Sequence, residues 1–268
     1  MRNRNHTKAL GQVFTFFSTA SAVGKTCLTA NVATYLAQKG FKVCLVNADL
    51  QFGDICRYLG ANPTNTIYSY VEAMENDKDG FVSIETFLTE TNYDFKILPA
   101  PKELDEAYQI SVENVIQAVA NLKVGYDYII IDTTTGFTDI NVALLEYTDV
   151  LLVPCVIDFL PTIRNLRIGL DTLEKLQFNM NKVHLILNRY KAETQISIKD
   201  VEKLLNRSFQ YYIANDYMGF RKSIEAMKPI VLTEGSQIVD DIKLMVEQEL
   251  GTEGENVGIK SWFNKLWK

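Results

Sequence analysis

The stretch that most constrains this chain is a hydrophobic run ending at Ser18, followed by Gly24-Lys25-Thr26 and a helical pattern that reaches Gln38. A strand, a short loop and a helix in this order bind nucleotide phosphates, because the loop amides and the positive end of the helix dipole face the same anion. A lysine ammonium and a hydroxyl that ligates Mg²⁺ complete such a site. The residues predicted to hold the phosphates are therefore Val23, Gly24, Lys25, Thr26 and Cys27.

The loop itself is poor in glycine. The usual signature begins with glycine, where this chain has Thr19. Glycine is used in such loops because it tolerates positive φ and a close backbone approach. Ser21 and Ala22 are small enough to follow the same path with modest strain. We therefore expect a phosphate-binding loop in which other residues have replaced most of the glycines.

Apolar, strand-like runs alternate with helical patterns through most of the chain. The runs are rich in β-branched residues and leucine, which is typical of parallel strands buried on both faces. The pattern predicts an α/β fold, a doubly wound and mostly parallel sheet with helices on both faces. The expected strands cover 14–18, 42–47, 95–98, 126–132, 150–156 and 183–188, and the expected helices cover 27–38, 67–74, 111–122, 138–147, 161–177 and 197–206.

Polar residues lie at the ends of four of these strands, at the edge where such sheets bind ligands: Ser18, Asp49, Asp132 and Asn188. Asp132 is placed to hold Mg²⁺, directly or through water, opposite Thr26, and helix capping is its alternative role. Asp49 is expected to orient or deprotonate the attacking water, with Asp54 as a weaker candidate and a simple turn as the non-catalytic reading. Asn188 is expected to present its amide to an adenine edge, unless it is a buried turn asparagine.

Composition limits the remaining possibilities. The 268 residues are 47% hydrophobic and 22% charged, enough for one large core, and the net charge of −6 argues against nucleic acid as a partner of the whole surface. The four cysteines show no metal-binding spacing, and neither an export signal nor a membrane span is recognisable, so we expect a reduced, cytoplasmic protein. The expected organisation is a basic N-terminal segment at 1–11, one domain at 12–250, a glycine-rich linker at 251–258 and a tail at 259–268.

Several other polar and aromatic residues favour structural roles. His184 lies within an apolar strand, and one histidine makes no metal site, so packing is expected. Arg164 and Arg167 favour a solvated helix face over a contact with a partner. Packing is also expected, in preference to stacking on bases, for Tyr211, Tyr212, Tyr217 and Phe220.

Taken in order, these motifs resemble the ParA/MinD superfamily of P-loop ATPases over about residues 12 to 250. Within that superfamily the chain is most similar to the TadZ/CpaE-like branch of pilus assembly proteins. The resemblance implies a P-loop NTPase fold, ATP and Mg²⁺ as ligands, a nucleotide-dependent homodimer, Lys25 and Asp49 as the catalytic candidates, and an adenine contact at Asn188. The residues that carry it are Asp49-Leu50-Gln51-Phe52-Gly53-Asp54, Leu98-Pro99-Ala100-Pro101, Leu160-Pro161-Thr162-Ile163-Arg164 and Leu187-Asn188-Arg189.

Two positions depart from the superfamily pattern. Ala20 stands where most members carry a second lysine that reaches the phosphates of the partner subunit. Asn47 replaces an acidic residue that is common two positions before the switch aspartate. Loss of a cation near developing negative charge lowers catalysis. ATP binding and dimerisation are therefore better supported than fast hydrolysis, and a slow ATPase is the expectation.

The tail carries an apolar helical stripe beside lysines. The stripe resembles a helix that lies in a membrane interface, and docking on the protein's own surface or on a partner is the alternative. One short helix binds weakly, whereas two copies in a dimer bind much better, so the protein is expected to attach peripherally to the inner face of the cell membrane. The stripe consists of Ile259, Trp262, Phe263, Leu266 and Trp267.

These features together favour an ATP-binding, dimerising protein that positions or assembles a cell-envelope machine, most specifically a Tad-type pilus, with pilus or secretion proteins as partners. A DNA or plasmid partition ATPase is the first alternative, and it predicts salt-sensitive binding to nonspecific DNA. A scaffold that keeps the fold without hydrolysing nucleotide is the second.

Overall fold

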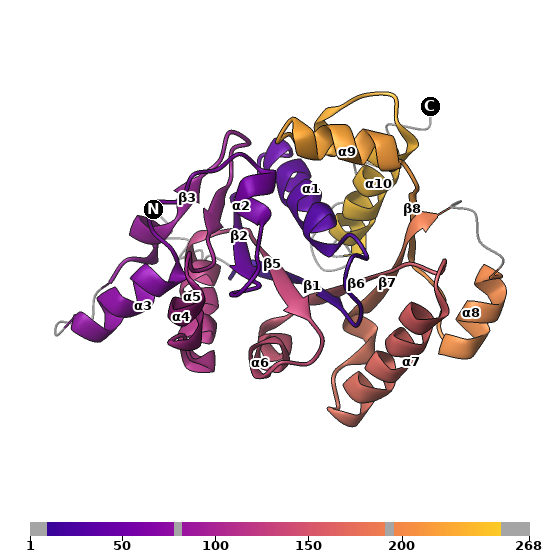
Figure 1. Ribbon diagram of the computed structural model, residues 1–268, viewed down its shortest axis with the longest axis horizontal. Coiled ribbons are helices and arrows are strands. Elements are labelled where there is room, and N and C mark those ends of the chain that lie inside the picture. The colour runs from indigo at the N-terminus through magenta and orange to yellow at the C-terminus, as the bar shows by residue number, and fades with distance from the viewer. Residues whose placement is uncertain (1–9, 78–81, 191–195, 253–268) are drawn as a thin grey trace, which may run out of the picture.

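In the computed structural model, which describes residues 10–77, 82–190 and 196–252, one sheet runs through the centre of the molecule (Figure 1). The strand order is β3-β4-β2-β5-β1-β6-β7-β8, and all neighbours are parallel except the β3–β4 pair. The strands are β1 (Gln12–Ser18), β2 (Val43–Ala48), β3 (Thr89–Glu90), β4 (Lys96–Leu98), β5 (Tyr128–Thr135), β6 (Val150–Cys155), β7 (Val183–Tyr190) and β8 (Tyr211–Ala214).

Helices cover both faces of this sheet, which confirms the predicted doubly wound architecture. One face packs against α1 (Lys25–Gln38), α2 (Ile55–Tyr58), α9 (Tyr217–Glu225) and α10 (Gln237–Thr252). The other face packs against α3 (Ile67–Asn76), α4 (Leu104–Tyr108), α5 (Val112–Gly125), α6 (Asp139–Tyr147), α7 (Leu160–Lys175) and α8 (Ile198–Leu205).

The central strands are apolar throughout because both of their faces are buried. Alternate residues of β1 enter different cores, with Val13 facing α5 and Phe14 facing α1, and both are at most 1% exposed. Polar caps fix the starts of several helices. Thr66, Ser111 and Thr138 each accept a hydrogen bond from a backbone amide in the first turn of α3, α5 and α6. Local capping and periodicity explain why these helices lie where the sequence predicts them.

The sequence prediction missed strands β3 and β8 and helices α2, α4 and α9. Strand β8 is four residues long, and β3 is an antiparallel edge strand of two residues. Helix α9 follows β8 directly and lies beside α1 at the upper edge in Figure 1. Tyr211 is buried in β8, as its expected packing role requires, but Tyr217 at the start of α9 is 70% exposed. The expectation of a packing role for Tyr217 is therefore wrong.

His184 lies on β7, and its environment fits the structural role predicted for it. Its Nδ1 is 2.5 Å from Oε1 of Glu249 on α10, and the hydroxyl of Tyr211 donates to the same oxygen at 2.6 Å. These contacts fix the last helix to β7 and β8. No helix of the described ranges is long and apolar enough to cross a membrane.

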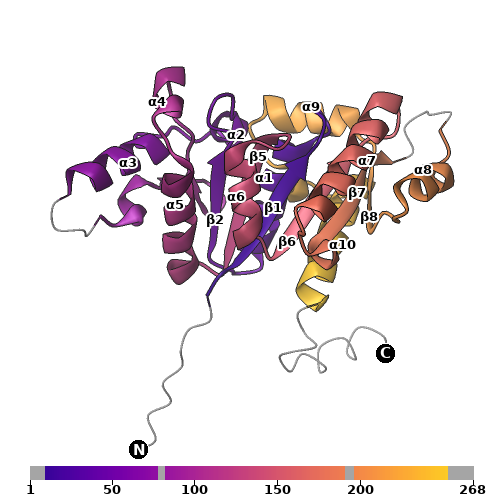
Figure 2. The same cartoon turned by 90° about the horizontal axis from the view of Figure 1, so that it is seen from below.

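All parallel strands end at one edge of the sheet, where α2, α4 and α9 also lie (Figure 2). Helix α10 ends at the opposite edge. It continues to Thr252, two residues beyond the expected domain boundary. Most of the expected linker, the whole apolar stripe of the tail and most of the basic N-terminal segment lie outside the described residues.

Candidate nucleotide-binding site

The phosphate loop connects β1 to α1 at the carboxyl edge of the sheet. Gly24 precedes the first turn of α1 with φ of +91°, a left-handed conformation that favours glycine. A Cβ at this position would lie 2.3 Å from Nδ2 of Asn188, so glycine is also required by the close approach of β7. Ala22 has φ of +59°. The loop therefore has a strained left-handed residue at Ala22 although glycine is missing there.

Lys25 and Asp132 form a buried ion pair beneath the loop. Their Nζ and Oδ1 atoms are 3.3 Å apart, and Asp132 is fully buried. Nζ of Lys25 also donates to the backbone carbonyl of Thr133, and the hydroxyl of Thr29 is 3.4 Å from Oδ1 of Asp132. These contacts hold the Lys25 ammonium at the carboxyl end of β5.

Asp132 is held close to Thr26, as the metal-site prediction requires. Burial raises the pKa of the Asp132 carboxyl, whereas the charge of Lys25 and a hydrogen bond from Thr26 lower it, and the charge of Asp49 raises it further. Oδ2 of Asp132 is buried and has no hydrogen-bond partner. A hydroxyl and an unpartnered carboxylate oxygen are the ligand types that Mg²⁺ prefers. The residues present therefore fit a magnesium ion, which Thr26 and Asp132 would hold.

The segment after β2 supplies the acidic candidate for hydrolysis. Asp49 is half-buried, and its Oδ1 accepts a hydrogen bond of 3.4 Å from the amide of Phe52. Its charge acts on Asp132, so the two carboxylates lie at one site. Asp54 is exposed at the start of α2. Of the two candidates, Asp49 is therefore the one that is partly buried and whose charge acts on Asp132.

Asn47 is a further polar residue at this site. It is 1% exposed, it pairs in register with Asp132 on the neighbouring strand, and its Oδ1 has no hydrogen-bond partner. A Cβ at Gly53 would lie 2.2 Å from that oxygen, so the loop after β2 packs directly on the Asn47 amide. In the sequence, Asn47 was noted only because it replaces an acidic residue. Its position at the end of a strand could have indicated that it lies at the site.

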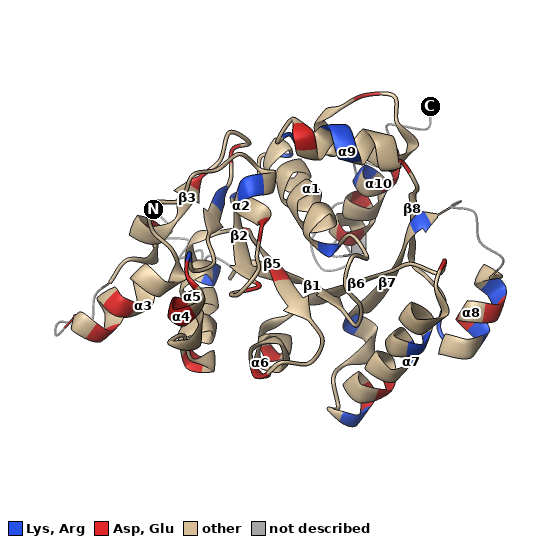
Figure 3. Cartoon of the chain, viewed as in Figure 1, with Lys and Arg blue, Asp and Glu red and all other residues tan. Residues whose placement is uncertain are grey.

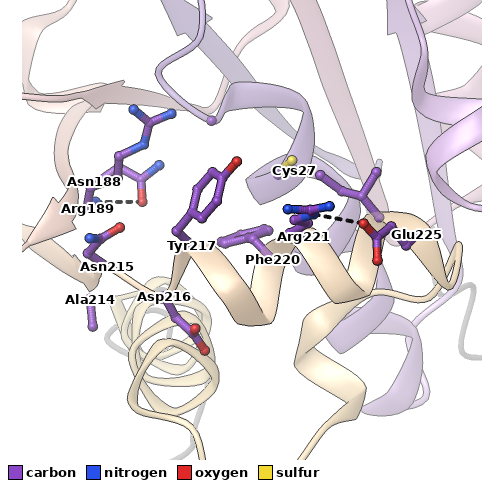
Figure 4. Close-up of a pocket in the computed structure, with 12 residues that line it drawn as sticks. Cys27, Asn188, Arg189, Ala214, Asn215, Asp216, Tyr217, Phe220, Arg221 and Glu225 are labelled. Carbon is purple, nitrogen blue, oxygen red and sulfur yellow. Dashed lines mark hydrogen bonds and ion pairs between the residues drawn. The ribbon is translucent and has the colours of Figure 1, made fainter.

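A pocket opens beside the loop, between the ends of β7 and β8 and helix α9. Its cavity volume is about 350 Å³, within the range typical of small-molecule sites. Figure 4 shows the ring of Tyr217 in the middle of the pocket, with Arg189 on one side and Arg221 on the other. The residues that line it include Gly24, Cys27, Asn188, Asn215, Tyr217 and Phe220. The sequence predicted the first three as ligand contacts and missed the contribution of α9.

The structure gives the hydrogen bonds of Asn188 and the protonation state of Cys27, two of the predicted contacts in this pocket. Asn188 is 5% exposed; its Nδ2 donates to the carbonyl of Val23 at 2.8 Å, and its Oδ1 accepts from the amide of Arg189 at 2.9 Å. Burial, and to a smaller degree the charge of Asp132, raises the pKa of the Cys27 thiol to about 11. Cys27 therefore remains a neutral thiol at physiological pH and lines the pocket without acting as a nucleophile.

Known proteins share this fold and part of this sequence. A family model described as an AAA domain matches residues 11–190. The septum site-determining protein MinD of Thermotoga maritima is 30% identical over 185 residues, which cover 68% of this chain and 65% of that protein. The chain thus spans just under two thirds of this relative.

Two solved structures superimpose on almost the whole described chain. A ParA family ATPase from Chlorobium tepidum gives a TM-score of 0.80 at 23% identity, over 88% of this chain and 98% of the other. MinD of Pyrococcus horikoshii, solved in complex with Mg-ADP, gives 0.78 at 20% identity, over 93% and 100%. At these identities the superpositions establish the fold, which is that of the ParA/MinD-type P-loop proteins.

Proposed function

Because the chain belongs to the AAA domain family and has the ParA/MinD-type P-loop fold, we propose that it binds ATP with Mg²⁺ and acts as an ATP-controlled homodimer. The observation that carries this proposal is the buried Lys25–Asp132 pair, with its unpartnered carboxylate oxygen, beside a pocket of nucleoside size. A buried charge pair costs desolvation energy, so its retention at the mouth of a ligand pocket supports a binding role.

Each part of the site has a role toward the nucleotide. Lys25 and the amides at the start of α1 bind the phosphates, and Thr26 and Asp132 hold the magnesium ion, which neutralises phosphate charge when bound. Asn188 and Tyr217, which line the pocket, would contact the base. Asp49 accepts a hydrogen bond from the attacking water and so orients it. Ala20 supplies no cation at the loop, so turnover is slow.

Isothermal titration calorimetry with MgATP tests nucleotide binding. The wild type should release heat with a defined stoichiometry, and Lys25→Ala should release almost none. Equal heats for the two proteins would remove the nucleotide site and leave a scaffold without nucleotide chemistry.

Exposed apolar side chains around the site support the homodimer. Phe52 is 74% exposed after β2, Tyr108 is 77% exposed on α4, and Phe159 and Leu160 are 61% and 68% exposed at the start of α7. All lie on segments that follow the carboxyl ends of strands, where the phosphate loop also lies. Large apolar residues exposed near one surface mark an interaction site, and a second copy of the chain would cover them.

Light scattering after gel filtration tests the dimer. MgATP should double the mass of the wild type, and Leu160→Asp should prevent this because it places a charge in the interface. Leu176→Asp is the matched control, since Leu176 is 47% exposed just beyond the opposite end of α7. A monomer at all nucleotide concentrations would disprove the homodimer.

The finer assignment is to a cell-envelope machine, most specifically a Tad-type pilus, with pilus or secretion proteins as partners. Its support is the sequence resemblance to TadZ/CpaE-like proteins, together with the amphipathic pattern at 259–268. The protein then lies in the cytoplasm and attaches to the inner face of the membrane as a dimer.

Flotation with anionic vesicles tests the membrane step. Binding should require MgATP and should disappear when residues 259–268 are removed. A partition ATPase predicts a different outcome, which is ATP-dependent binding to nonspecific DNA that weakens with salt. Figure 3 shows Lys and Arg together with Asp and Glu on α7, α8 and α9, whereas α3 and α4 carry Asp and Glu alone. The same protein should be tested against DNA in parallel.

A further inference from the structure

Two consecutive residues at the end of β7 hold two consecutive carbonyl groups of the phosphate loop. Nδ2 of Asn188 donates to the carbonyl of Val23 at 2.8 Å, and Nη2 of Arg189 donates to the carbonyl of Ala22 at 2.8 Å. The Asn188 amide is oriented by a further bond, from the amide of Arg189 to its Oδ1. Figure 4 shows these two side chains at one end of the pocket.

Both ends of the Arg189 contact have unusual backbone conformations. Ala22 has φ of +59° and Arg189 has φ of +56°, so both are non-glycine residues in the left-handed region. This region is unfavourable for residues with a Cβ, and such residues persist only where their surroundings hold them. The hydrogen bond between Arg189 and Ala22 provides such a restraint on each.

Gly24 meets the same strand in a different way. The backbone of Gly24 approaches the Asn188 amide so closely that no Cβ would fit, and glycine is retained there. At Ala22 the space tolerates a Cβ, and the carbonyl is instead fixed from outside. The loop thus has glycine at position 24, where a Cβ would clash. At Ala22, where a Cβ fits, a hydrogen bond from the Arg189 side chain stabilises the left-handed conformation.

We propose that Asn188 and Arg189 are positioning residues that keep this glycine-poor loop in its phosphate-binding shape. The proposal rests on the nucleotide binding proposed above, and it assigns to Arg189 a role that the sequence did not indicate. It also limits the hydrogen bonds that Asn188 can make to a base. After its bonds to Val23 and Arg189, the Asn188 amide retains one N–H and one oxygen lone pair. Fixing the loop before phosphate arrives removes part of the ordering cost of binding.

A double substitution tests whether Arg189 acts through the strained residue. Arg189→Met should weaken MgATP binding roughly tenfold in calorimetry, because a loop that relaxes away from the left-handed conformation must be reordered. In the Ala22→Gly background the same substitution should cost less than about threefold, because glycine adopts this conformation freely. Arg57→Met, at an exposed arginine of α2, is the matched control and should change nothing.

Arg189→Lys separates a positional role from a simple charge. Lysine keeps the charge but lacks the planar fork of the guanidinium, so it should lose much of the affinity if position matters. Full affinity with lysine, equal losses in the two Ala22 backgrounds, or no loss in either would each overturn the proposal.

Hydrogen exchange of the ligand-free protein gives a second readout that needs no nucleotide. The amides of Ser21 to Gly24 should exchange faster in Arg189→Met than in the wild type. In the Ala22→Gly background, adding Arg189→Met should not change their exchange rates. Unchanged exchange would contradict the proposal even if MgATP binds. If the wild type binds no nucleotide, the proposed function fails, whereas this comparison still decides what Arg189 does. Equal melting temperatures confirm that the variants are folded.

Discussion

The two ends of the candidate site are built in opposite ways. The phosphate end consists of the loop and the start of α1, which are contiguous in sequence, together with Asp132 on β5, and its charged groups Lys25 and Asp132 are at least nine-tenths buried. The base end joins the distant segments β7, β8 and α9, and its central side chain, Tyr217, is 70% exposed.

This difference follows from what each end must recognise. A phosphate is a concentrated charge, so its ligands must be fixed in position and shielded from water. A base offers a flat, largely apolar face, and an aromatic ring in a half-open pocket is sufficient to contact it. We therefore expect substitutions at the phosphate end to have large effects and substitutions at the base end to have small ones.

The largest effect is expected at Lys25. Lys25→Met should weaken MgATP binding by more than about 100-fold, since a buried charge-assisted contact to phosphate is lost. It should weaken inorganic tripolyphosphate to a similar degree, because that ligand uses only the phosphate end. Competition calorimetry measures both ligands. Loss of ATP binding with tripolyphosphate binding intact would break the comparison.

Asp132 should act through the magnesium ion. Asp132→Asn should reduce the gain in ATP affinity that Mg²⁺ provides by roughly tenfold and should leave Mg²⁺-free ATP binding unchanged or stronger, because a negative charge near the phosphates is removed. Titrations in Mg²⁺ and in EDTA distinguish these cases. An equal effect in both buffers would assign Asp132 a structural role.

A smaller effect is expected at the base end. Tyr217→Ala should weaken MgATP about fivefold, in line with the loss of one base–aromatic contact, and should leave tripolyphosphate binding unchanged. Met218→Ala is the matched control, because Met218 is 58% exposed on the same helix and does not line the pocket. Equal behaviour of the two variants would remove α9 from the base site.

The smallest effect concerns the pH dependence of stability. The pKa of Asp132 is raised on folding, so the folded state binds more protons, and this contribution to stability is present at low pH and lost as the pH rises through the raised pKa. Asp132→Asn should remove this dependence. Urea unfolding of the ligand-free proteins between about pH 4 and pH 7 measures the difference. If the wild type gained stability relative to Asp132→Asn as the pH rises, the predicted direction of the pH dependence would be wrong.

The phosphate end was predictable because its signals are local. Gly24-Lys25-Thr26 after a strand specifies the loop, and Asp132 after three isoleucines marks the end of a buried strand. The sequence already favoured Asp49 over Asp54, and burial and the charge effect on Asp132 support the same choice. The catalytic and ligand roles of these residues remain predictions for the experiments above.

The base pocket was less predictable because no local pattern encodes it. Strand β8 is too short to be recognised from the sequence. Tyr217, which follows it, lies among aromatic residues of the kind that usually pack in a core. Whether an aromatic side chain is buried or lines a cavity depends on which segments the sheet order brings together. Here β8 lies beside β7, so α9 reaches the pocket next to Asn188.

The sequence by itself determined the layered fold, the position of the phosphate loop and the identity of its charged residues, because hydrophobic periodicity and strand-end polarity are properties of short segments. Only the tertiary structure decided that Asn188 and Arg189 donate hydrogen bonds to the loop carbonyls, that Ala22 takes a left-handed conformation, and that α9 lines the pocket beside the loop. Those contacts join residues more than 160 positions apart, and their geometry is set by the packing of the whole sheet.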